Sequence, residues 1–141
     1  MILTQEEQQF LRGNILMIDR ITVSSSVETK IQTILDSSGF ATKATVIRLA
    51  LSLGIKYSDK CFDYQFEDKS GGTYTRNVIF QGKDDVYFSL IKMVEERYID
   101  ESDIIIKFLP KYLNFGIEIL HEKFVNNNQE SSLKWLLSEV E

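Results

Sequence analysis

The segment from Lys43 to Lys56 most constrains the fold, because it is apolar on almost every side when read as a helix. Only a narrow polar strip interrupts apolar positions such as Val46, Leu49 and Leu53. A helix of this kind has to be buried against other structure. Because neighbours in a small domain are too few for that, we predict a buried helix at a dimer core, with Thr42 as its N-cap.

A strand and a helix are predicted just before this segment. From residue 18 to residue 24, apolar Ile21 and Val23 alternate with polar residues, which is typical of a strand with one dry and one wet face. The stretch 25–28 has the form of a capping box, and the apolar stripe of a helix follows it. The order strand, helix, helix is typical of a ribbon–helix–helix unit, in which two chains pair their strands. We place this unit at residues 15–57.

The remaining chain is predicted to be helical apart from a long loop at 57–83, with or without a hairpin of 62–66 and 73–80. A third helix starts at residue 84, and we expect its apolar positions to face inward: Val86, Leu90, Met93 and Val94. A fourth helix starts near residue 102, and Pro110 is expected to kink or break it. The fold class is therefore mainly α: a single domain over 1–141, with the ribbon–helix–helix-like unit followed by a small helical bundle at 84–141.

Charge and composition limit the classes of function. The net charge is −5, yet residues 1–60 carry seven basic against six acidic residues, and residues 61–141 carry nine against fifteen. A nucleic acid would therefore meet the N-terminal part, and binding would be weak or assisted by a partner. The single cysteine excludes an intrachain disulfide. Because the chain has no run of 18 apolar residues and no secretory start, we expect a cytoplasmic protein without membrane contact.

The ribbon–helix–helix pattern itself predicts which residues would contact DNA. The wet face of the strand carries Arg20, Thr22 and Ser24, which in such a ribbon would point into the major groove. Thr42 and Lys43 stand at the N-terminus of the apolar helix, where backbone N–H groups favour a phosphate. The alternative is that these polar residues form an ordinary solvated surface.

Three segments resemble one known family, the DNA sulfur modification protein DndE family: 44–53 (ATVIRLALSL), 74–83 (YTRNVIFQGK) and 113–120 (LNFGIEIL). The resemblance spans residues 20–125. It implies a compact protein that forms a homo-oligomer (dimer or tetramer) and acts with other sulfur-modification proteins. It also implies binding of double-stranded or nicked DNA through surface lysines. The acidic balance of this chain departs from that expectation and puts the strength of binding by the chain alone in doubt.

With the resemblance, the candidate DNA-binding residues are Arg20, Thr22, Ser24, Lys30, Thr42, Lys43 and Arg76. Two of them have a structural alternative. For Lys30 a solvated helix face is the favoured interpretation. Arg76 lies in a loop, where function tends to collect, but its guanidinium is also suited to tie that loop to an acidic residue of the third or fourth helix.

We predict no catalytic residue, no metal and no cofactor. Sulfur transfer needs a reactive cysteine, and Cys61 stands among aromatic residues as a small hydrophobic residue would. Glu118 and His121 have the spacing of metal ligands on one helix face, but a site needs three or four ligands. The alternatives that remain open are a ribbon–helix–helix repressor or antitoxin that reads a palindrome through Arg20 and Thr22, a metal-dependent nickase using Glu118 and His121, and an acidic docking face for a basic subunit.

Overall fold

A computed structural model describes residues 4–6, 20–61 and 68–139. It is mainly α, as predicted, with one small antiparallel sheet. The elements in chain order are β1 (Arg20–Thr22), α2 (Ser25–Ser38), α3 (Lys43–Lys56), the 3-10 turn η1 (Ser58–Lys60), β2 (Thr73–Thr75), α4 (Arg76–Phe80), α5 (Asp84–Glu95), α6 (Glu101–Asp103), the π-helical turn η2 (Ile104–Phe108), α7 (Leu109–Asn126) and α8 (Gln129–Glu139).

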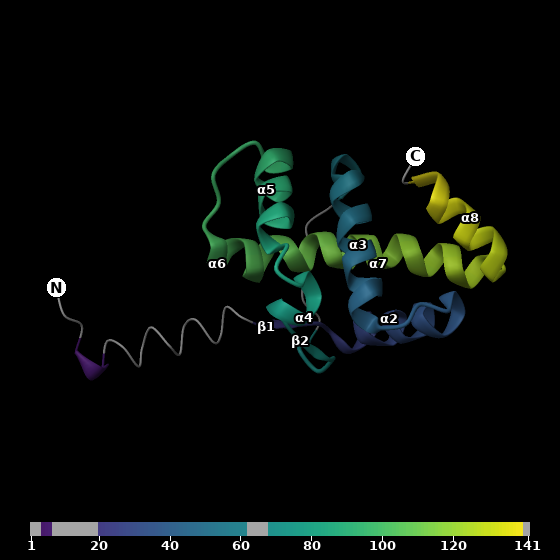
Figure 1. The fold of residues 1–141 in the computed structure, drawn as a ribbon, viewed down its shortest axis with the longest axis horizontal. Helices are drawn as coiled ribbons and strands as arrows, with labels where there is room; N and C mark the ends of the chain where they lie inside the picture. Colours follow the sequence, from purple (N-terminus) through teal and green to yellow (C-terminus); the bar gives the residue numbers. More distant parts are fainter. Residues whose placement is uncertain (1–3, 7–19, 62–67, 140–141) are drawn as a thin grey trace.

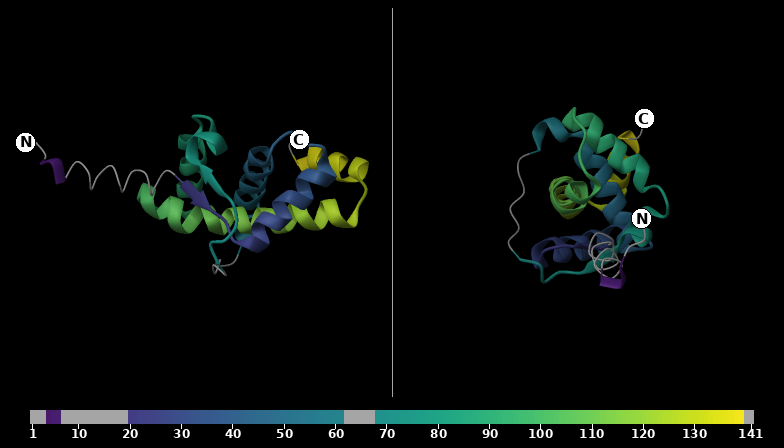
Figure 2. Two further views of the ribbon diagram at one scale, coloured as in Figure 1. Left: turned by 90° about the horizontal axis from the view of Figure 1, so that it is seen from below. Right: turned by 90° about the vertical axis from the view of Figure 1, so that its left-hand side faces the viewer.

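Helix α7 runs through the length of the folded part (Figure 1). Helix α3 crosses α7, and α2 also packs against α7. The view along α7 in Figure 2 shows α2 on one side and α3 with α5 on the other. The helices α3 and α7 approach so closely that each presents a glycine to the other's backbone. A Cβ at Gly116 would lie 1.7 Å from the carbonyl oxygen of Ala50, and one at Gly54 would lie 2.1 Å from that of Tyr112.

The predicted helix over 43–56 is confirmed, and the Thr42 hydroxyl accepts from the backbone N–H of Thr45 at 3.3 Å. The prediction that a second chain must bury it is wrong, because α7, α2 and α4 of the same chain already cover its apolar faces. Ile47, Ala50 and Leu51 are fully buried within one chain. The apolar character of α3 therefore reflects its position between helices and requires no dimer.

The strand pairing also differs from the prediction. β1 pairs with β2 of the same chain, with Arg20 opposite Thr75 and Thr22 opposite Thr73. The two-stranded ribbon is thus closed within one chain rather than between two copies. The second hairpin arm predicted at 73–80 is a strand only as far as Thr75, where α4 begins, and its partner at 62–66 lies outside the described residues, as do residues 18 and 19.

Helix α5 packs in the opposite sense to the prediction. It buries Phe88 and Ile91, whereas the four residues expected to face inward are exposed, from 38% for Val94 to 70% for Met93. The buried pair and the exposed four residues both have helical spacing. Phe88 faces inward because its ring packs edge-on against that of Phe80 of α4, with ring centroids 5.8 Å apart. An apolar stripe of Val86, Leu90, Met93 and Val94 is therefore left facing outward.

Pro110 marks a break, one of the two outcomes expected from the sequence. α7 begins at Leu109, so Pro110 occupies its first turn. The π-helical turn η2 precedes it. The C-terminal helix α8 folds back along α7 (Figure 1). Its Glu139 carboxylate accepts from Lys56 at the end of α3, with Nζ and Oε2 2.6 Å apart.

Candidate nucleic-acid interface

The outer face of the ribbon carries one cation and several hydroxyls. Arg20 is exposed, and among the described residues it forms no ion pair. Beside it, the hydroxyls of Thr22 and Thr73 are 3.1 Å apart across the two strands. Alternation along a strand puts Arg20 and Thr22 on the face opposite the buried Ile21. The ribbon therefore presents to the outside a guanidinium that pairs with no described acidic residue, beside two hydroxyl groups.

Ser24 does not belong to this face, and the prediction that it points outward is wrong. The strand ends at Thr22, and the chain turns into α2, so the alternation stops before residue 24. The Ser24 side chain is 1% exposed and its hydroxyl accepts from the backbone N–H of Val27, which makes it the N-cap of α2. A buried cap is not available to DNA.

An open hollow of about 670 Å³ lies where α3 begins, next to β2 and α4. Thr42, Lys43, Tyr74 and Asn77 contribute polar groups to its lining. The first turn of α3 leaves backbone N–H groups and the positive end of the helix dipole at this place. Two predicted contacts, Thr42 and Lys43, thus lie in the hollow, and β2 connects it to the outer face of the ribbon.

Lys43 is not free within that hollow. Its ammonium lies 2.6 Å from the Glu28 carboxylate of α2, and the Tyr74 hydroxyl and the Gly72 backbone N–H also donate to Glu28, at 2.6 and 3.2 Å. Partial burial by itself would raise the pKa of Glu28, but the hydrogen bonds from Lys43 and Tyr74 outweigh it and hold that pKa below its ordinary value. Burial and the bond to Glu28 raise the pKa of Tyr74. Glu28 is therefore an ionised acceptor that joins α2, α3 and β2.

The other two predicted cations are paired as well. Lys30 forms an ion pair with Glu118 across α2 and α7. Arg76 binds Asp84, with Nη2 and Oδ2 2.7 Å apart, and also Glu101, while its guanidinium lies over the ring of Phe88. The reading in which Arg76 ties its loop to acidic residues is the one that the contacts bear out. It joins the start of α4 to the starts of α5 and α6.

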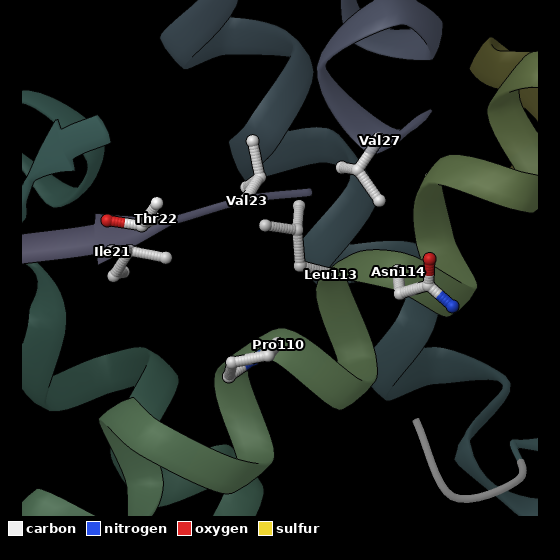
Figure 3. Close-up of a pocket in the computed structure, with 7 residues that line it drawn as sticks. All are labelled: Ile21, Thr22, Val23, Val27, Pro110, Leu113 and Asn114. Carbon is white, nitrogen blue, oxygen red and sulfur yellow. The ribbon is translucent and has the colours of Figure 1, made fainter. Parts of the chain in front are cut away.

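A small pocket of about 10 Å³, enough for about one water molecule, lies on the inner side of the ribbon (Figure 3). Ile21 of β1 and Val23, which follows β1, line it together with Leu113 and Pro110 of α7. The polar residues of its lining are Asn114 and Thr22, whose hydroxyl is engaged with that of Thr73. A lining of this kind serves packing under the ribbon and provides no acid, base or nucleophile, so we place the candidate interface on the outside.

Glu118 and His121, two of the residues considered for catalysis, lie on the same face of α7 and line one open hollow. Glu118 is engaged by Lys30, and no group of three His, Cys, Asp or Glu side chains among the described residues is placed to hold a metal ion. Cys61 is half-buried, and its thiol lies 3.9 Å from the carbonyl oxygen of Lys111. In the part of the chain that the structure describes, no helix has both the length and the apolar character needed to cross a bilayer.

Glu28, Thr73 and Tyr74 also belong to this region, although none of them is among the DNA-binding residues predicted from the sequence. Glu28 was assigned to a capping box, whereas the structure aims it at Lys43, 15 residues later, and at Tyr74, 46 residues later. Thr73 and Tyr74 lie in the hairpin arm considered at 73–80, which by itself does not show which strand it pairs with. Only the pairing of β1 with β2 brings them beside Arg20 and the start of α3.

The described residues form a small, mainly helical protein with a two-stranded antiparallel ribbon. A comparison with family models matches residues 20–128 to the DNA sulphur modification protein DndE. Because this match covers more than half of the chain, the protein belongs to the DndE family and is a component of a DNA sulfur-modification, or phosphorothioation, system. A search of curated proteins finds no match.

Proposed function

We propose that the chain is a DNA-binding accessory subunit of a DNA sulfur-modification system, which binds double-stranded or nicked DNA and leaves sulfur transfer to another component. The observation that carries this proposal is Arg20 on the outer face of the ribbon, which forms no ion pair with residues 4–6, 20–61 or 68–139 and lies near the hollow at the start of α3. Family membership supports association with other components of the system. The internal pairing of Lys30, Lys43 and Arg76 supports weak binding by the chain alone.

Replacing Arg20 with alanine is expected to lower the affinity for a short duplex about five- to tenfold at low salt, because one phosphate or base contact is lost. Fluorescence anisotropy with intact and nicked duplexes measures this. Arg97→Ala is the matched control, since it removes the same charge from an exposed position after α5. An equal loss in both variants would mean that binding follows net charge and that Arg20 has no special role.

Selection from random duplexes extends this test to the alternative functions. An accessory subunit of a modification system should enrich no palindrome, whereas a repressor or antitoxin should. If the wild-type protein binds neither intact nor nicked duplex at low salt, with or without its partner proteins, the DNA-binding proposal is wrong. Nicking by a clean preparation that is lost on replacing Glu118 and His121 together would instead indicate an enzyme.

We further propose that copies of the chain associate through the α5 stripe, the surface formed by Val86, Leu90, Met93 and Val94. Exposed apolar surface of this kind, on the side of the helix opposite its buried residues, is typical of a protein–protein interface. Met93→Asp should convert an oligomer to a monomer in light scattering after size exclusion. Val125→Asp is the control, because Val125 is also about half exposed, at 51%, but lies on α7. A wild-type protein that is monomeric at high concentration would contradict the oligomer.

A further inference from the structure

The ion pair between Lys43 and Glu28 stands at the edge of the hollow that the proposed function assigns to DNA. Lys43 lines the hollow, and its side chain remains 35% exposed despite the pair. An ammonium group in this position has a route to a phosphate in the hollow. The same phosphate would then come close to the carboxylate of Glu28, which lies 2.6 Å from Lys43 Nζ.

Glu28 is held in place much more firmly than Lys43. Besides Lys43, its two carboxylate oxygens accept from the Tyr74 hydroxyl and the Gly72 backbone. The backbone at Gly72 approaches so closely that an added Cβ would lie 2.7 Å from Glu28 Oε2. The carboxylate is thus fixed by partners from β2 and the turn before it, and it does not swing aside when an anion approaches.

The pair between Lys30 and Glu118 differs in this respect. Glu118 is about half exposed, at 47%, and Lys30 is the one partner of its carboxylate that the described residues provide. Its side chain is free to rotate away from Lys30. Two ion pairs of the same chemical type therefore differ in how readily the lysine is released, and the locked one lies at the DNA hollow.

We propose that Glu28 is an autoinhibitory residue: its fixed carboxylate neutralises Lys43 and repels phosphate, which keeps the DNA affinity of the isolated chain low. The inference rests on the proposed DNA binding and adds its regulation. A partner subunit that withdrew Glu28 from Lys43 would create a cationic site at the start of α3 without any change in the number of basic residues. The acidic net charge of the chain is compatible with DNA binding on this basis.

The test is a set of four variants measured by anisotropy with the same nicked duplex over a salt series: Glu28→Gln, Glu122→Gln, Lys43→Ala and the double variant Glu28→Gln/Lys43→Ala. Glutamine keeps an acceptor for the Tyr74 hydroxyl or the Gly72 N–H and removes the charge. We expect Glu28→Gln to bind about three- to tenfold more tightly at low salt and to steepen the salt dependence by about one ion. Glu122→Gln removes an equal charge from an exposed position on α7 and should change affinity less than twofold.

Lys43→Ala should have less than a twofold effect in the wild type, where Lys43 is neutralised, but should abolish the gain in the Glu28→Gln background. Thermal unfolding followed by circular dichroism shows whether each variant is folded. Equal gains from Glu28→Gln and Glu122→Gln, or a gain that survives the loss of Lys43, would overturn the inference. If Glu28→Gln does not fold, a loss of more than fivefold in Lys43→Ala alone overturns it, and a loss below twofold supports it.

The proposed DNA binding and the proposed autoinhibition by Glu28 are rejected by different outcomes. Wild-type binding without any gain in Glu28→Gln rejects the autoinhibition and leaves DNA binding intact. Absence of binding by the wild type together with clear binding by Glu28→Gln supports the inhibition and places DNA binding under the control of a partner. Absence of binding by every variant rejects both.

Discussion

Gly116→Ala is expected to destabilise the protein by about 3 kcal/mol or more, although an alanine in place of a helical glycine ordinarily stabilises a helix by about 1 kcal/mol. The added Cβ would lie 1.7 Å from the carbonyl oxygen of Ala50, which is backbone and has no rotamer to escape to. Helices α3 and α7 would have to separate, and the core between them would open. Urea denaturation followed by circular dichroism measures the change in free energy of unfolding.

Gly82→Ala is the matched control for this experiment. Gly82 has φ of +84°, and nothing lies within 4 Å of an added Cβ there. Its replacement should therefore cost only about 1 kcal/mol, the conformational penalty of a side chain in the left-handed region. A Gly116→Ala variant as stable as the wild type would show that α3 and α7 do not pack as closely as described.

Leu51→Ala should cost about 2–5 kcal/mol of unfolding free energy, since it leaves a cavity in the middle of α3. Leu51 is fully buried by its own chain. The loss should therefore be the same in the wild type and in a Met93→Asp background, because the two residues lie on different surfaces and act independently. The midpoint of urea denaturation, measured at several protein concentrations, gives both values.

A concentration-dependent effect of Leu51→Ala would support the dimer core instead. If Leu51→Ala destabilised the protein strongly only at concentrations where it is oligomeric, then a second copy, and not α7, would bury α3. The experiment thus distinguishes the observed burial within one chain from the burial between chains that the composition of residues 43–56 suggested.

The local elements were readable from the sequence because local interactions determine them. The spacing of apolar residues gave α3 its bounds, and Thr42 marked its start as the cap found in the structure. The class of fold, mainly α, and the DndE family followed from this pattern and from three short segments. For Pro110 and for Arg76 the sequence left two alternatives each. For Arg76 only the contacts with Asp84 and Glu101 decided between a DNA contact and a tie within the chain.

What depends on distant residues was decided by tertiary structure alone. Periodicity shows that a helix has an apolar face but not which neighbour covers it. For this reason the prediction of a dimer core at α3 was wrong, and the prediction of which side of α5 faces inward was also wrong. Likewise, one strand cannot show whether its partner comes from the same chain, and β2 lies more than 50 residues after β1. The charge state of the candidate interface has the same origin: composition counts Lys43 and Arg76 as cations, but their neutralisation by Glu28, Asp84 and Glu101 arises only when the chain folds.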